Sequence, residues 1–338
     1  MNQQNKQIIT QSYRVTPSDA GIRIDQYISN MFPEYSRGTV QKWIGNDYIL
    51  INSEPCKAKQ KLKGFEKIDI NVTIEAVIDD KPQKMDLNII FEDDELIVIN
   101  KPAGLLVHPG SGNPDNTLLN GLLAHNETQS LLPRAGIVHR LDKLTSGLMV
   151  VAKTTNAFNS LVDQLKDHTV TRQYFAIVKG AINSDNRIDQ PIGRHQKHRT
   201  KMAVSISGKR AVTNFQLLEN FKHYTTIKVN LETGRTHQIR VHMHYVGHQL
   251  LGDPVYGNPL RVEPSVEEGL KSIIRQFPRQ ALHAQVLAFI HPKSNKLVTY
   301  KCKIPEDLSD LLEELRDFDS IKTQHEDDGD WDVYFPEE

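Results

Sequence analysis

The most informative segment of this 338-residue chain is Ala135-Gly136-Ile137-Val138-His139-Arg140-Leu141-Asp142-Lys143-Leu144-Thr145-Ser146-Gly147-Leu148-Met149-Val150-Val151-Ala152-Lys153. Two apolar, strand-like runs flank its polar centre, so Asp142 is predicted to lie in a loop held between rigid elements. Functional side chains are often placed in such loops. The charges of Arg140 and Lys143 favour the ionised carboxylate. A single loop aspartate is most often an ordinary polar residue or a cap, so other segments must decide whether this one carries chemistry.

The length of the chain predicts a main domain and one smaller module. We expect a disordered tail at 1–12, a small module at 13–75, a linker at 76–85, a main domain at 86–318 and an acidic tail at 319–338. The linker is polar and contains Pro82. In the acidic tail, Glu326-Asp327-Asp328-Gly329-Asp330 is typical of a disordered segment.

Apolar periodicity predicts an α+β fold class: a mixed, largely antiparallel sheet with flanking helices, beside a small α/β N-terminal module. A helix is expected at Asn156–Lys166, capped by Thr154 or Thr155. The expected strands of the main domain are Leu87–Phe91, Leu96–Asn100, Gly147–Lys153, Gln173–Val178, Thr213–Leu218 and Thr225–Leu231.

Charge is divided unevenly along the chain. Residues 305–338 hold 14 acidic and two basic side chains, so the net charge of -1 for the whole chain leaves +11 on residues 1–304. Such a balance is typical of a surface that meets a polyanion, RNA or DNA. A well-solvated surface with a lopsided tail explains the charge equally well.

The small module has a second basic feature. Arg23–Ile28 is predicted to be an amphipathic helix, and Ser36 to cap a second helix that runs through Trp43. Short strands are expected around Tyr48–Asn52 and Lys67–Val72. Lysines at every second position from 57 to 63 would share one side of an extended segment, beside Arg37 and Lys42, and form a basic groove. An ordinary solvated face is the simpler interpretation.

Gly136–Gly147 resembles the signature loop of the pseudouridine synthases that modify large-subunit ribosomal RNA, in which the aspartate of His-Arg-Leu-Asp is catalytic. The similarity covers nearly all of residues 83–304, although Leu144 stands where members of the family often carry an acid. Val15–Val72 resembles a small RNA-binding module of a small-subunit ribosomal protein. Further segments that resemble motifs of the family, in its order, are Asn100–Pro109, Arg172–Ala176, Gly234–His242, Leu251–Gly257 and Leu282–Pro292.

This resemblance implies an isomerisation that needs no cofactor, metal or energy source. Asp142 would attack the sugar or the base, or remove a ribose proton, and the sequence does not choose among these schemes. Tyr174 would lie against the target base and could accept the sugar proton. Arg240 would pair with Asp142, and Arg140 would fill the gap left by a uridine flipped out of its stack.

The implied partner is RNA, either large-subunit ribosomal RNA or its assembly intermediates. We expect no DNA partner and a monomer. We also expect no membrane partner and a cytoplasmic location, because the chain lacks a signal-peptide pattern and a long apolar run. Cys56 and Cys302 have no metal-binding or redox spacing, which fits a reducing compartment. Residues 194–201 are expected to be a mobile basic loop that clamps the RNA backbone. The candidate RNA-binding residues are Arg140, Arg37, Lys42, Lys57, Lys59, Lys61, Lys63, Arg194, Lys197, Arg199, Lys201 and Arg235.

Three other functions stay open at this point. A metal enzyme would use the histidines His237, His242, His244 and His248, of which only the last two have helical metal-binding spacing. A non-catalytic RNA-binding or ribosome-assembly protein would share the same basic surface. A DNA glycosylase would also need an acid and a stacking ring, but it would release a free base.

Overall fold

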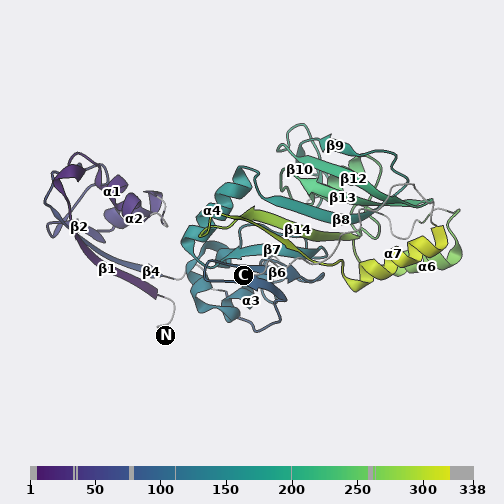
Figure 1. The fold of residues 1–338 in the computed structure, drawn as a ribbon, viewed down its shortest axis with the longest axis horizontal. Coiled ribbons are helices and arrows are strands. Elements are labelled where there is room, and N and C mark those ends of the chain that lie inside the picture. The colour runs from purple at the N-terminus through teal and green to yellow at the C-terminus, as the bar shows by residue number, and fades with distance from the viewer. Residues whose placement is uncertain are drawn as a thin grey trace.

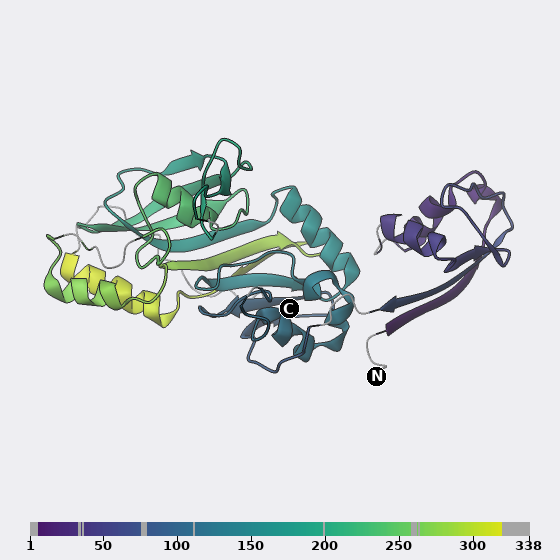
Figure 2. The ribbon, with the colours of Figure 1, turned by 180° about the vertical axis from the view of Figure 1, so that it is seen from behind.

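The computed structural model describes residues 6–32, 35, 37–75, 80–110, 112–198, 200–257, 262 and 264–319. Figures 1 and 2 show a small N-terminal unit and a larger unit, from opposite sides. A separate core cluster, drawn only from residues between Val15 and Val72, stabilises the small unit. None of the described helices is long and apolar enough to cross a lipid bilayer.

The small unit packs two helices on an antiparallel sheet of order β1-β4-β2-β3. Its apolar helix positions, such as Ile28 and Val40, are fully buried against the strands. The two helices and the two strands that we expected here are therefore confirmed, whereas the cap at Ser36 lies outside the described residues. Its elements are β1 (Lys6–Arg14), α1 (Ile24–Met31), α2 (Arg37–Gly45), β2 (Ile49–Ile51), β3 (Glu54–Pro55) and β4 (Lys67–Glu75).

The prediction of a disordered tail at 1–12 is wrong for residues 6–12. They belong to β1, which pairs antiparallel with β4 from Lys6 opposite Glu75 to Arg14 opposite Lys67. Ile9 and Tyr13 lie on one side of this strand and pack against the core of the small unit. The polar residues between them gave the segment the composition of a tail, and only pairing with a distant strand makes it regular. Residues 1–5 lie outside the described part.

The lysine row is also different from our expectation. Gln60 donates its backbone N–H to the carbonyl of Lys57 over 2.7 Å, so the chain turns there and is not extended from 57 to 63. Leu62 is buried, which leaves Lys61 and Lys63 on the outside. The four lysines are exposed, but they do not line one side of a strand.

The larger unit is built on a nine-stranded sheet of order β5-β6-β7-β14-β8-β13-β12-β9, with β15 paired to β14. Its strand pairs are antiparallel except β7 with β14, which are parallel. This arrangement confirms the predicted α+β class. The strands are β5 (Ile89–Glu92), β6 (Leu96–Lys101), β7 (Ser146–Ala152), β8 (Thr171–Lys179), β9 (Asn186–Asp189), β12 (Val212–Asn220), β13 (Tyr224–Leu231), β14 (Leu282–Ile290) and β15 (Leu297–Lys301).

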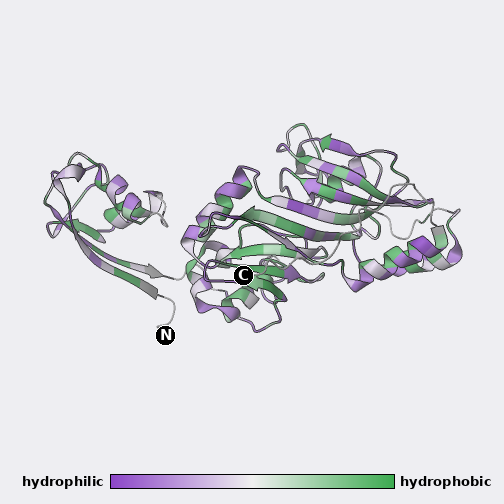
Figure 3. Ribbon diagram, in the orientation of Figure 1, coloured by the Kyte–Doolittle hydropathy of each residue, from purple (hydrophilic) through white to green (hydrophobic). Residues whose placement is uncertain are grey.

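β7 is buried along its whole length, because both faces of the sheet are covered there. Met149 and Val151 pack on the side of α3 (Leu118–His125), whereas Leu148 and Val150 pack on the side of α4 (Thr155–Lys166). Figure 3 shows the hydrophobic colour concentrated in β7 and the strands beside it, β6 and β14. The strand is therefore a rigid support for the loop that precedes it. The helices are α3 (Leu118–His125), α4 (Thr155–Lys166), α5 (Gln238–Tyr245), α6 (Glu268–Gln276) and α7 (Glu306–Asp319), and the short hairpin is β10 (Ile192–Arg194) with β11 (Met202–Val204).

Helix α4 confirms the predicted helix, and the side chain of Thr154 caps it by accepting the N–H of Ala157. The expected linker is partly wrong, because its last residues are bound to the larger unit. The side chain of Asn120 donates to the carbonyl of Lys81 over 2.9 Å, and the backbone N–H of Gln83 donates to Asn120. Asp319 ends α7, and residues 320–338 of the expected acidic tail lie outside the described part.

Candidate active site

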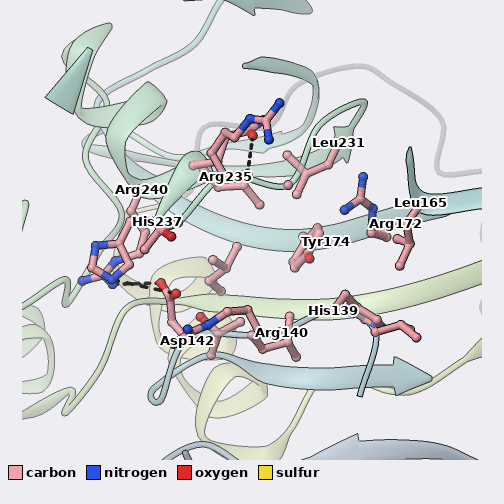
Figure 4. A pocket seen from close by; sticks show the side chains of 18 of the residues that line it. His139, Arg140, Asp142, Leu165, Arg172, Tyr174, Leu231, Arg235, His237 and Arg240 are labelled. Atoms are coloured by element: carbon pink, nitrogen blue, oxygen red, sulfur yellow. Dashed lines mark hydrogen bonds and ion pairs between the residues drawn. The ribbon is translucent and has the colours of Figure 1, made fainter. Parts of the chain in front are cut away.

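A cleft of about 690 Å³ opens beside the loop that leads into β7 (Figure 4). Asp142 reaches it from this loop, Tyr174 from β8, and Arg240 from α5. Three side chains that are far apart in the sequence are thus brought to one cavity. Asp142 is the only acidic residue among the described residues that line it.

Asp142 is held by Arg240, as we predicted. The Nη1 of Arg240 donates to Oδ2 of Asp142 over 2.9 Å, and the side chain of Asp142 remains 19% exposed to the cleft. The Nε2 of His237 lies 3.9 Å from the other carboxylate oxygen. One oxygen of Asp142 is therefore fixed by a charged hydrogen bond, while the group stays open to a ligand.

A second carboxylate, Asp253, fixes Arg240 itself. Its two oxygens accept from Nε and Nη2 of Arg240 over 2.7 and 2.9 Å, and its side chain is fully buried. Burial by itself would lower the pKa of Arg240, but the two carboxylates outweigh it and raise that pKa. The guanidinium thus stays charged in a buried place. Sequence reasoning missed this role of Asp253, although its segment had been singled out as a motif.

Contacts with neighbouring segments also stabilise the loop of Asp142. Lys101 is buried and donates from Nζ to the carbonyls of Pro102, Leu105 and Lys143, over 2.8, 3.0 and 3.2 Å. At the start of β7, Gly147 has φ +118°, and a Cβ there would lie 2.2 Å from the carbonyl oxygen of Ala284. A side chain at this position would force β7 away from β14.

Tyr174 is 7% exposed and lines the cleft between Asp142 and Arg172 (Figure 4). Burial raises the pKa of its hydroxyl, and the nearby positive charge of Arg172 only partly opposes this. The phenol is therefore protonated at neutral pH. This state favours contact of the ring with a base over a role as proton acceptor.

His139 lines the cleft and stabilises the loop of Asp142. Its Nε2 accepts the backbone N–H of Val150 over 3.1 Å, which ties the loop to β7. Burial lowers the pKa of His139 to about 3, and the charge of Arg172 adds to this effect. The ring is therefore neutral at physiological pH.

Three of the four histidines considered for a metal site, His237, His242 and His248, form hydrogen bonds with separate partners. His237 contacts the hydroxyl of Tyr256 over 2.8 Å, and His242 contacts the carbonyl of Gln190 over 2.9 Å. His248 contacts the carbonyl of Lys179. Among the residues that the structure describes, no three His, Cys, Asp or Glu side chains are grouped as ligands for a metal.

Comparison with known proteins agrees with this geometry. Residues 95–245 match the model of the RNA pseudouridylate synthase family. The "Ribosomal large subunit pseudouridine synthase D" of Escherichia coli (strain K12) is 46% identical, over 94% of this chain and 97% of that protein. The chain belongs to the RNA pseudouridine synthase family. The protein of the same name from Xanthomonas campestris is 44% identical, over 94% of this chain and 97% of that protein.

Two solved structures support the fold of this synthase. "Human RNA Pseudouridylate Synthase Domain Containing 4" has a TM-score of 0.53 at 26% identity, and covers 68% of this chain and 93% of its own. "Human RNA Pseudouridylate Synthase Domain Containing 1" has a TM-score of 0.51 at 26% identity, and covers 70% and 97%. The predicted family and fold are confirmed, and the enzyme is an isomerase.

The predicted RNA-binding residues divide between the cleft and other surfaces. Arg140 and Arg235 line the cleft. Arg194 lies in β10, and Lys197 and Lys201 lie between β10 and β11, and these three residues do not line the cleft. The Nζ of Lys201 donates to the carbonyl of Val255 over 2.7 Å. Arg199 lies outside the described residues.

In the small unit, Lys42 is exposed, whereas Arg37 is already paired. The guanidinium of Arg37 donates both to Oδ1 and to Oδ2 of Asp25, whose side chain is fully buried. Burial by itself would raise the pKa of Asp25, but hydrogen bonds from Arg37, Gln41 and Arg23 outweigh it and hold that pKa far below its usual range. Arg37 therefore stabilises the fold of the unit, besides any contact with RNA.

Sequence reasoning missed several basic residues of the cleft. Arg172 was visible in the motif with Tyr174, since residues two apart in a strand share one face. His108 stands in the motif-like segment Asn100–Pro109, whereas Arg134, Lys166 and His168 carry no local signal. The missed basic residues are His108, Arg134, Lys166, His168 and Arg172.

Proposed function

We propose that this synthase isomerises specific uridines of large-subunit ribosomal RNA, with Asp142 as its catalytic carboxylate. The observation that carries the proposal is the accessible carboxylate of Asp142, the only acid among the described lining residues, bound to Arg240 at 2.9 Å. The printed names of the relatives support this substrate. Such a substrate also places the enzyme in the cytoplasm of a bacterium.

The reaction breaks the bond between ribose C1′ and the base nitrogen, turns the base, and joins C1′ to C5. The hydrogen of C5 leaves as a proton and N1 of the base takes one up, so the product is an isomer of the substrate and no oxidant is required. Asp142 attacks the sugar or the base, or removes a ribose proton, and Arg240 holds its carboxylate in place in each scheme. Tyr174 lies against the base.

Transcripts of large-subunit ribosomal RNA labelled with tritium at C5 of uridine test the proposal. We expect tritium release, and pseudouridines that carbodiimide labelling and primer extension can map. Release of free uracil would identify a glycosylase instead. Tight binding without tritium release from any transcript would identify a non-catalytic assembly protein.

We propose that Arg140 is a wedge that holds the target base out of its stack. Its side chain is exposed and shares the loop of Asp142. Arg140→Ala should slow single-turnover tritium release on a structured RNA. An RNA in which the same uridine is already unpaired should recover most of the lost rate, because the cost of flipping is removed. An equal defect on both RNAs would contradict the wedge.

We propose that the small unit contributes affinity and not chemistry. Changing Lys57, Lys59, Lys61 and Lys63 to Gln in the full chain should weaken RNA binding and flatten its dependence on salt. The turnover number at saturating RNA should be unchanged. A chain that begins at Asp80, which keeps the contacts of Lys81 and Gln83 with the larger unit, should behave in the same way. Full affinity in both variants would assign the unit another purpose.

A further inference from the structure

Arg172 occupies the end of the cleft that lies away from Asp142, with Tyr174 between them (Figure 4). Arg172 and Tyr174 are two residues apart on β8, so both side chains leave the same face of the sheet. If the base of a nucleotide contacts Tyr174, the RNA backbone next to that nucleotide can therefore reach the end of the cleft that holds Arg172.

The guanidinium of Arg172 is buried, and no carboxylate of the described residues pairs with it. The residue is 9% exposed, and its buried Nε has no hydrogen-bond partner among the residues that the structure describes. In the described part of the chain, its polar contact is one hydrogen bond of 3.4 Å from Nη2 to the carbonyl of Glu232. A buried cation in this condition costs folding free energy, so it is expected at sites that receive an anion.

The chain makes room for this guanidinium. A Cβ on Gly234 would lie 2.6 Å from Nη1 of Arg172. By contrast, the other buried arginine of the cleft, Arg240, is neutralised by Asp142 and Asp253. Arg172 is therefore a buried cation of the cleft whose charge the described residues leave uncompensated.

Leu165 lies beside Arg172 in Figure 4, and basic residues that follow it along the chain also line the cleft. Leu165, Lys166 and His168 come from the end of α4 and from the turn after it, and they line the cleft with Arg172. Among the described residues, six Lys or Arg side chains line the cleft, against the one carboxylate of Asp142. The charge selects an anion, and the planar fork of arginine suits the oxygens of a phosphate.

We propose that Arg172 forms a phosphate subsite, which binds a backbone phosphodiester of the RNA next to the uridine that enters the cleft. This inference rests on the proposed function, because it places the uridine at Tyr174. Lys166 and His168 border the subsite. Arg172 thus fixes where along the RNA the base enters, and contributes to substrate positioning without taking part in the bond changes.

Equilibrium binding of a fluorescent hairpin of large-subunit ribosomal RNA tests the subsite independently of turnover. The hairpin is made with one uncharged methylphosphonate placed in turn at each phosphate. With the wild-type enzyme, we expect one position near the modified uridine to weaken binding by about ten- to hundredfold. Arg172→Gln should weaken binding of the unmodified hairpin by the same factor. The methylphosphonate at that position should then weaken binding to the variant no further.

Arg275→Gln is the matched control, since it removes one exposed guanidinium from α6, which does not line the cleft. This control should keep the sensitivity to the methylphosphonate. The slope of log affinity against log salt should fall by roughly 0.7–0.9 for Arg172→Gln, as expected for one lost phosphate contact, and remain unchanged for the control.

Two further outcomes separate this role from others. Arg172→Gln should melt at an equal or higher temperature than the wild type, because an uncompensated buried charge is removed. The subsite is refuted if no methylphosphonate position weakens binding to the wild type. It is also refuted if the losses of affinity caused by the methylphosphonate and by Arg172→Gln are additive. If Arg172→Gln instead changes the pH dependence of tritium release and keeps the sensitivity to the methylphosphonate, Arg172 acts through Tyr174 and not through a phosphate. Failure of the wild type to release tritium would refute the proposed function, whatever the binding results.

Discussion

Asp142→Asn should lower single-turnover tritium release by at least about a thousandfold. The amide has nearly the shape of the carboxylate, but it can neither attack as an anion nor accept a proton effectively. Binding of RNA should be equal or slightly tighter, because one negative charge leaves a basic cleft. The fold should persist, because Arg240 retains its paired hydrogen bonds with the buried Asp253.

Asp310→Asn is the control for this variant, since Asp310 is an exposed carboxylate on α7. It should bind RNA and release tritium like the wild type. Activity of Asp142→Asn near the wild-type level, at an unchanged melting temperature, would mean that another group carries the chemistry.

Arg240→Met should destabilise the larger unit by about 3–5 kcal/mol, because it leaves the buried carboxylate of Asp253 without its partner. It should also lower turnover on structured and opened RNAs alike, since Asp142 loses the group that orients it. Chemical denaturation measures the first effect, and single-turnover tritium release the second. Arg140→Met, which removes an exposed cation, should change stability by less than about 0.5 kcal/mol.

A double variant separates the two roles of Arg240. Arg240→Met combined with Asp253→Asn removes the uncompensated charge, so much of the lost stability should return. Turnover should stay low, because Asp142 still lacks its partner. Recovery of activity together with stability would show that Arg240 serves the fold only.

Much of the fold was predictable because it depends on local patterns. Short apolar runs predicted β6, β7, β8 and β13 close to their observed bounds, and Thr154 predicted the start of α4. The strand at Lys6–Arg14 was missed, because its regular structure depends on hydrogen bonds to β4, more than fifty residues away. The lysine row was misjudged for a similar reason, since the turn at Lys57–Gln60 leaves no strong local signal.

The sequence by itself determined the family and the identity of the candidate catalytic loop, because ordered motifs survive as strings of residues. It also predicted the pair of Arg240 and Asp142, which lie 98 positions apart. Only the tertiary structure decided that Asp253 neutralises Arg240, that Arg37 is paired with Asp25, and that no described residue supplies a counter-charge to the buried Arg172. The physical reason is burial: the free energy of a charged group depends on which distant groups surround it, and residue type and spacing do not report this.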